Sequence, residues 1–146
     1  MSTLRRTRRR TKILQWTPDG ASIVYVRESL KSEAARTRRH PYQLDIWKVD
    51  AASGEKTALT RTDHDENYPY ADPMGRGLIY TSDRNGVFNI YIDTPEEDPY
   101  PVTNAVGGVF HLNLDRSGKI LIFCAFKDRG WDIFRMNHPL RRRKRN

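Results

Sequence analysis

The sequence has a single cysteine and no long hydrophobic run. Cys124 cannot form an internal disulfide, and its position at the end of the apolar run 120–124 favours a buried structural thiol. No stretch of about 18 apolar residues is present, so the sequence predicts no transmembrane helix. The basic N-terminus is not followed by the apolar segment of a signal peptide. As written, the sequence therefore predicts a cytoplasmic protein.

The common catalytic and cofactor-binding motifs are also missing. The sequence contains no phosphate-binding loop, no His-Glu-x-x-His zinc motif, no Cys-x-x-Cys pair and no Gly-x-Ser-x-Gly nucleophile elbow. Its four histidines are scattered along the chain. We therefore expect no enzymatic activity, no catalytic residue and no cofactor.

One acidic cluster, at residues 63–67, has the residue types that a hard cation such as calcium prefers. Its carboxylates are those of Asp63, Asp65 and Glu66. The cluster lacks the glycine that calcium loops with alternating ligands place at their sharp turn. An exposed linker between two blades of the repeat described below is the alternative interpretation, and we favour it over a metal site.

Basic residues are concentrated at the two ends of the chain. Residues 1–12 hold six basic residues and no acid, and residues 141–145 are all basic. The net charge of +8 therefore belongs to the tails, because the body between them carries 15 basic and 18 acidic residues. Such tails are usually solvated, and these contain no aromatic residues for base stacking. Solvated tails and contacts with nucleic acid or another anionic surface are both consistent with this pattern.

What the sequence does have is an internal repeat with a period near 43 residues. Asp45, Asn89 and Asp132 begin similar strands and are 44 and 43 residues apart, and Tyr80 and Phe123 are also 43 apart. A period of this length is typical of one four-stranded blade of a β-propeller. The sequence therefore predicts an all-β protein built from antiparallel propeller blades.

Each repeat follows the same order of strands and turns. A Pro-Asp-Gly or Ser-Gly turn precedes a buried β-rich strand, and a second turn leads to an Ile-Tyr type strand. The first two repeats end on an outer strand that closes with Leu59-Thr60 or Val102-Thr103, whereas the third shows no such strand. About three blades are therefore expected, the third incomplete. The predicted blades are residues 13–60, 68–103 and 109–137, between a basic N-terminal tail, 1–12, and a basic C-terminal tail, 138–146.

The first repeat is longer than the others between its two central strands. An insertion of about eleven residues lies within 28–40 and is basic towards its end. Loop insertions of this kind often carry function. A functional loop and a solvated loop are equally consistent with the sequence.

With these residues in view, the repeats resemble the WD40-like (PD40) repeat of TolB-type β-propellers. The first element of the signature is matched by residues 16–20 and its middle by residues 80–91. The signature residues, which we interpret as structural, are Trp16, Pro18, Asp19, Gly20, Asp83, Arg84, Gly86, Tyr91, Asp128, Arg129 and Gly130. We expect Asp83 and Asp128 to cap their own turns. Blade packing is the role expected for the aromatic residues Tyr25, Trp47, Tyr80, Tyr91, Phe123 and Phe134.

The resemblance implies a non-catalytic scaffold that binds another protein. TolB-like propellers have about six blades, so three blades imply either a homo-oligomer that completes the ring or a part of a longer protein. The resemblance also implies a periplasmic location if the chain is a truncated TolB-like protein. Alternatives are a binder of nucleic acid or anionic surfaces through the tails, and the propeller domain of a serine oligopeptidase-like hydrolase without its catalytic domain.

Overall fold

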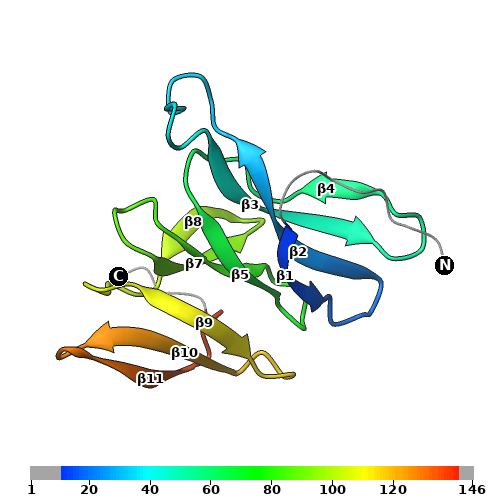
Figure 1. Cartoon of the computed structure of the whole chain (residues 1–146). Coiled ribbons are helices and arrows are strands. Elements are labelled where there is room, and N and C mark those ends of the chain that lie inside the picture. The colour runs from blue at the N-terminus through cyan, green and yellow to red at the C-terminus, as the bar shows by residue number, and fades with distance from the viewer. Residues whose placement is uncertain (1–10, 142–146) are drawn as a thin grey trace.

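The computed structural model describes residues 11–141, which form eleven strands in three antiparallel sheets (Figure 1). The first sheet contains β1 (Thr11–Trp16), β2 (Ser22–Leu30), β3 (Tyr42–Asp50) and β4 (Lys56–Ala58). The second contains β5 (Glu66–Ala71), β6 (Leu78–Ser82), β7 (Asn89–Thr94) and β8 (Glu97–Pro101). The third contains only β9 (Val109–Leu114), β10 (Ile120–Lys127) and β11 (Gly130–Asn137). We call these sheets blades one, two and three, and they confirm the predicted partial propeller.

The three blades repeat their strand register as well as their strand order. In every blade an aromatic residue of the second strand lies opposite an aromatic residue of the third. In blades two and three the two rings are stacked, with centroids 6.2 and 5.7 Å apart. These cross-strand pairs are Tyr25–Trp47, Tyr80–Tyr91 and Phe123–Phe134.

The turn between the first two strands is also the same in each blade. Its last residue is a glycine at φ +70°, Gly20, Gly75 or Gly118. The N–H of this glycine donates to the carbonyl oxygen three residues earlier, over 2.8–2.9 Å. A left-handed backbone at this position strains any residue with a Cβ, so the turn explains why the repeat carries glycine there.

Each innermost strand contains a bulge at the same repeat position, which the sequence pattern did not reveal. Ile13, Tyr68 and His111 have φ values of 50°, 51° and 54°, at irregularities in the pairing of β1, β5 and β9. Their spacings of 55 and 43 residues equal those that separate Tyr25, Tyr80 and Phe123. The backbone conformation of the bulge therefore repeats in every blade, although the side chain at this position differs.

The core lies between neighbouring blades. Ile46 of blade one is fully buried with Leu78, Tyr80 and Tyr91 of blade two. The other face of blade two packs on blade three, in a cluster whose buried members are Ile79, Ile90, Ile92, Val109, Leu112, Leu121, Phe123, Ala125 and Leu140. Each blade thus covers one face of the blade before it.

The insertion in blade one lengthens a hairpin rather than forming a separate loop (Figure 1). The strands β2 and β3 pair as far as Leu30 and Tyr42, so only residues 31–41 form the connection. The inserted residues, predicted within 28–40, therefore lengthen β2 and β3 as well as the connection between them. Ser32 holds the base of the loop, because its N–H and hydroxyl both donate to the Asp63 carboxylate, over 2.8 and 2.6 Å.

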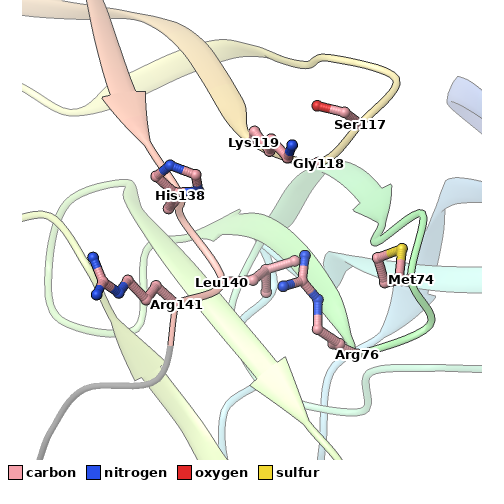
Figure 2. A pocket seen from close by; sticks show the side chains of 8 residues that line it. All are labelled: Met74, Arg76, Ser117, Gly118, Lys119, His138, Leu140 and Arg141. Carbon is pink, nitrogen blue, oxygen red and sulfur yellow. The ribbon is translucent and has the colours of Figure 1, made fainter.

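The first residues of the predicted C-terminal tail, 138–146, belong to the folded body. The N–H of His138 donates to the carbonyl oxygen of Lys119, and Leu140 is only 7% exposed within the cluster between blades two and three. Figure 2 shows the side chains around Leu140. They line a pocket of about 420 Å³ at this end of the interface, which includes Met74 and Arg76 of blade two. A tail beginning at 138 is therefore wrong for residues 138–141, because Leu140 supplies apolar surface to the core.

Candidate functional site

One repeat position differs sharply in exposure between the blades. Ile46, Ile90 and Ile133 occupy equivalent places in the third strand of blades one, two and three. Ile46 and Ile90 are 0% exposed because the next blade covers them, whereas Ile133 is 76% exposed. The outer face of blade three thus presents a core position to solvent.

Ile133 belongs to an apolar face rather than standing alone. The register places Cys124 opposite Ile133, and Phe126 opposite Trp131. Because side chains two residues apart in a strand share a face, these residues lie together on the side turned away from the buried Phe123–Phe134 pair. Cys124 is half-buried there, and Phe126, Trp131 and Ile133 are exposed.

Aromatic contacts extend this face towards the β10–β11 hairpin. The ring of Trp131 lies edge-on to Phe126 and Phe110, with centroids 5.6 and 5.5 Å apart. Phe110 in turn contacts Phe88 of blade two at 5.5 Å. We call the residues Phe110, Ile122, Cys124, Phe126, Trp131 and Ile133 the outer face of blade three. An exposed apolar surface of this kind is typical of a protein-interaction site.

The edge of blade three is open as well. Its strand order is β11-β10-β9, and β11 pairs only with β10 in the described part of the chain. In the other blades the corresponding strand is covered by a fourth strand, β4 or β8. An edge strand with free N–H and C=O groups can pair with another extended segment. The outer face and the β11 edge together form the candidate interaction site.

The predicted signature residues Asp83 and Arg84 form a network inside blade two. The Arg84 guanidinium donates to Glu66 Oε1 and to the hydroxyl oxygen of Tyr80, over 3.3 and 3.0 Å. It also lies 4.5 Å from the centre of the Tyr91 ring. Thr62 donates to the same Oε1 over 2.6 Å. Arg84 therefore ties the second turn to the buried carboxylate of Glu66, which is a structural role.

The Asp83 carboxylate does not have the expected role of capping its own turn. It accepts a hydrogen bond from the N–H of Asp65, over 2.9 Å, and lies 3.6 Å from the His64 ring nitrogen. It therefore fastens the segment before β5 to the turn after β6.

Asp128 and Arg129 are not the structural equivalents of Asp83 and Arg84. The 43-residue offset aligns them with Asn85 and Gly86 instead. They are the two central residues of a tight hairpin in which Lys127 pairs with Gly130, and both have positive φ, 49° and 69°. Positive φ at both central positions is the geometry of a two-residue type I′ turn. The expectation that Asp83 and Asp128 occupy repeated turns is therefore wrong.

The remaining signature residues lie in the first turn of blade one. The Asp19 carboxylate accepts hydrogen bonds from the Thr17 hydroxyl and from the N–H of Ala21, over 2.6 and 3.0 Å. These bonds, that of Thr17 first, lower the pKa of Asp19 below its usual value. Pro18 and Gly20 are the neighbouring turn positions. Trp16 ends β1 and is 62% exposed, so the free side of blade one also displays an aromatic residue.

The three acidic candidates for a metal site are held apart by different partners. Asp63 accepts from Ser32, Asp65 accepts from the N–H of Leu44 over 2.8 Å, and Glu66 is buried beside Arg84. Burial raises the pKa of Glu66 above its usual value, although the hydroxyls of Thr62 and Thr60 and the charge of Arg84 oppose the shift. Among residues 11–141 no three His, Cys, Asp or Glu side chains are grouped as metal ligands. The structure gives these carboxylates structural partners instead.

Most of the two tails predicted to contact nucleic acid, residues 1–10 and 142–146, lies outside the described residues. Within the described part, no helix is long and apolar enough to cross a membrane.

The chain matches no known family profile and no curated protein, but its fold matches solved structures. It is similar to putative TolB from Agrobacterium tumefaciens, with 21% identity and a TM-score of 0.65 over 84% of this chain and 43% of that one. TolB from Acinetobacter baumannii matches with 17% identity and a TM-score of 0.57, over 92% and 42%. The propeller domain of the trilobed protease from Pyrococcus furiosus matches with 12% identity and a TM-score of 0.63, over 89% and 40%.

At these identities the comparisons establish the fold rather than an activity. The chain spans less than half the length of each of these structures. Three blades, of which the third has an open face, are consistent with a chain that covers 40–43% of these structures. The chain therefore has a TolB-like β-propeller fold, of which the described residues form a part.

Proposed function

We propose that this protein is a non-catalytic scaffold of the TolB-type (PD40) repeat family that binds another protein through the outer face of blade three. The observation that carries the proposal is the exposure of Ile133 at a position where Ile46 and Ile90 are fully buried. Burying an aliphatic side chain of this size stabilises a complex by roughly 1.5–3 kcal/mol. A partner that covers this face therefore gains binding free energy by burying Ile133 as a neighbouring blade would.

A second copy of the chain has a suitable face to offer. Tyr25 and Trp47 occupy the positions in blade one that Tyr80 and Tyr91 occupy in blade two, where the latter pair contacts Ile46. The free side of blade one also carries Leu14, which is 61% exposed and lies opposite Tyr25. Tyr25 is already buried in its own chain, and Arg27 lies over the Trp47 ring. Leu14 and Trp16 are therefore the apolar surface that blade one of a second copy would offer to Ile133.

The proposal is tested by comparing the full chain with its Ile133→Arg variant. Light scattering at rising concentration measures self-association, and chemical crosslinking followed by mass spectrometry identifies any other protein bound to this face. We expect Ile133→Arg to weaken the association at least about tenfold, because a charge replaces a buried aliphatic contact. Met74→Arg is the matched control, since Met74 is 72% exposed in the turn between β5 and β6 of blade two.

The result against the proposal would be an Ile133→Arg protein with the same mass and the same crosslinked partners as the wild type. An unchanged circular dichroism spectrum of the variant establishes that the comparison concerns the surface and not the fold.

A further inference from the structure

We propose that the open edge of β11 is a peptide-binding site, which takes from another chain an extended segment that contains an aliphatic–threonine step. The inference rests on the proposed function and names the chemistry of its partner. In blades one and two the same edge is covered by β4 and β8.

Blades one and two hold the residues that follow their fourth strand through the same two hydrogen bonds. The N–H of Ile46 donates to the Thr60 hydroxyl oxygen, over 2.8 Å, and the N–H of Leu59 donates to the carbonyl oxygen of Ile46, also over 2.8 Å. In blade two, Ile90 N–H reaches the Thr103 hydroxyl at 2.9 Å, and Val102 N–H reaches the Ile90 carbonyl at 2.8 Å. In each blade one isoleucine therefore binds two consecutive residues, an aliphatic residue followed by threonine, which we call the aliphatic–Thr step.

A polar side chain completes the recognition in blade two. The Oδ1 atom of Asn89 accepts hydrogen bonds from the Thr103 hydroxyl and from the N–H of Ala105, both over 2.8 Å. Blade three carries Asp132 at the same repeat position, next to Ile133. The Asp132 side chain is exposed, and its carboxylate has the acceptor oxygen that Asn89 uses. Blade three thus presents the same isoleucine and the same acceptor, but no aliphatic–Thr step is bound to them in the described residues.

The aliphatic residue of the step has a place on blade three as well. Leu59 packs against the cluster that contains Ile46, and Val102 packs against the cluster that contains Ile90. An incoming aliphatic side chain beside Ile133 would cover part of its 76% exposed surface. Backbone pairing would give the segment its affinity and the side-chain positions its specificity, as in other cases of strand addition.

The described residues that follow β11, 138–141, do not return along this edge. Asp50, Thr94 and Asn137 end the third strand of their blades. After Asp50 and Thr94 the chain reverses into β4 and β8, and Asp50 N–H bonds the carbonyl of Glu55 across one of these turns. After Asn137 it leads instead to Leu140, which is buried between blades two and three (Figure 2). Residues 138–140 therefore lead into the core, and among the described residues no strand covers β11 on this side.

The chain itself supplies the probe for a test. A fluorescein-labelled synthetic peptide with the sequence of residues 97–106, which contains Val102-Thr103, is titrated with the full-length protein and followed by fluorescence anisotropy. We expect saturable binding. A peptide with Thr103→Val should bind about 3- to 10-fold more weakly, which corresponds to the loss of one hydrogen-bonding group.

Two changes in the protein locate the site. Ile133→Pro removes the N–H that would donate to the threonine hydroxyl, and proline is tolerated on an edge strand whose N–H faces outwards; we expect it to abolish peptide binding. Asp132→Asn reproduces the side chain of Asn89 and should keep the affinity within about twofold, whereas Asp132→Ala should weaken it about 3- to 10-fold. Near-ultraviolet circular dichroism identifies any variant that fails to fold.

The proposal is overturned if the peptide does not bind, or if it binds equally well with Thr103→Val and to the folded Ile133→Pro protein. Because Ile133→Arg keeps the backbone N–H, loss of partner binding in Ile133→Arg without any peptide binding would leave the proposed function standing and remove the edge site alone. Dependence of peptide binding on both Thr103 and Ile133 supports the site.

Discussion

Blades two and three share the order of their first three strands, the glycine turn between the first two and the aromatic pair between the second and third, yet they differ in what covers them. Ile90 of blade two is buried and its N–H donates to the Thr103 hydroxyl, whereas the equivalent Ile133 of blade three is exposed on an open edge. A repeat therefore fixes the shape of a blade without fixing its surroundings. The place where the pattern keeps a core residue but loses its cover is where we locate the interaction site.

The largest difference is expected from the same substitution at the two isoleucines. Ile90→Ala removes a side chain that is 0% exposed and should lower the free energy of unfolding by about 2–5 kcal/mol. Ile133→Ala, at 76% exposure, should change it by no more than about 0.5 kcal/mol in the monomer. Urea denaturation at a concentration below that of self-association measures both. Equal losses would mean that blade three is covered in solution.

A second, smaller contrast concerns the glycines of the first turn in blades one and three. Both have φ +70°, so alanine at either position should cost about 1–2 kcal/mol of backbone strain. A Cβ at Gly118 would also meet Asp72 Oδ1 at 2.8 Å and Pro73 Cδ at 3.0 Å, whereas a Cβ at Gly20 would meet nothing within 4 Å. Gly118→Ala should therefore destabilise more than Gly20→Ala, by about 1–3 kcal/mol for the additional crowding.

Thermal unfolding of the two glycine variants side by side gives the measurement. Similar losses in both would show that the turn of blade three does not pack against the turn of blade two.

The smallest effect is a dependence on pH that Glu66 gives to blade two and that its counterpart in blade three does not give. Glu66 of blade two lies at the repeat position of Val109 in blade three, and both are fully buried. Burial raises the pKa of Glu66 in the folded state above its ordinary value of 4.5, so the folded protein holds a proton that the unfolded chain has lost. The stability contributed by this group is therefore complete below pH 4.5 and falls as the pH rises through the raised pKa.

Glu66→Gln keeps the Oε1 acceptor and removes the titration. The difference in unfolding free energy between the wild type and this variant should thus move against the wild type as the pH rises from about 4.5. A difference that is constant with pH, or that moves the other way, would show that Glu66 is stabilised as a carboxylate by Arg84. Urea denaturation across a series of pH values distinguishes these results.

The sequence was sufficient for the architecture because spacing is enough to define it. The 43-residue period identified three blades and the missing outer strand of the third, since the Leu-Thr and Val-Thr steps of the first two have no counterpart after Phe134. The bulges at Ile13, Tyr68 and His111 could not be seen, because a positive φ in these strands is not marked by glycine or by any shared side chain.

The site was less predictable because it depends on contacts rather than on residue types. The matching Asp-Arg steps suggested equal roles for Asp83 and Asp128, but one lies in a six-residue connection between β6 and β7 and the other in a two-residue hairpin. The exposure of Ile133 could not be read from a strand that is apolar in every repeat. Leu140 was assigned to a tail because basic residues surround it, and only its burial between two blades reveals its role.

Hydrogen exchange of three amides tests the central claim most directly. The N–H groups of Ile46 and Ile90 are bonded to threonine hydroxyls, and Ile133 occupies the same position without a fourth strand in the described residues. In the monomer we expect the amides of Ile46 and Ile90 to exchange slowly and that of Ile133 to exchange at least about a hundredfold faster, because exposed edge amides open at little cost in free energy. An Ile133 amide as protected as that of Ile90 in the monomer would contradict the open edge of blade three.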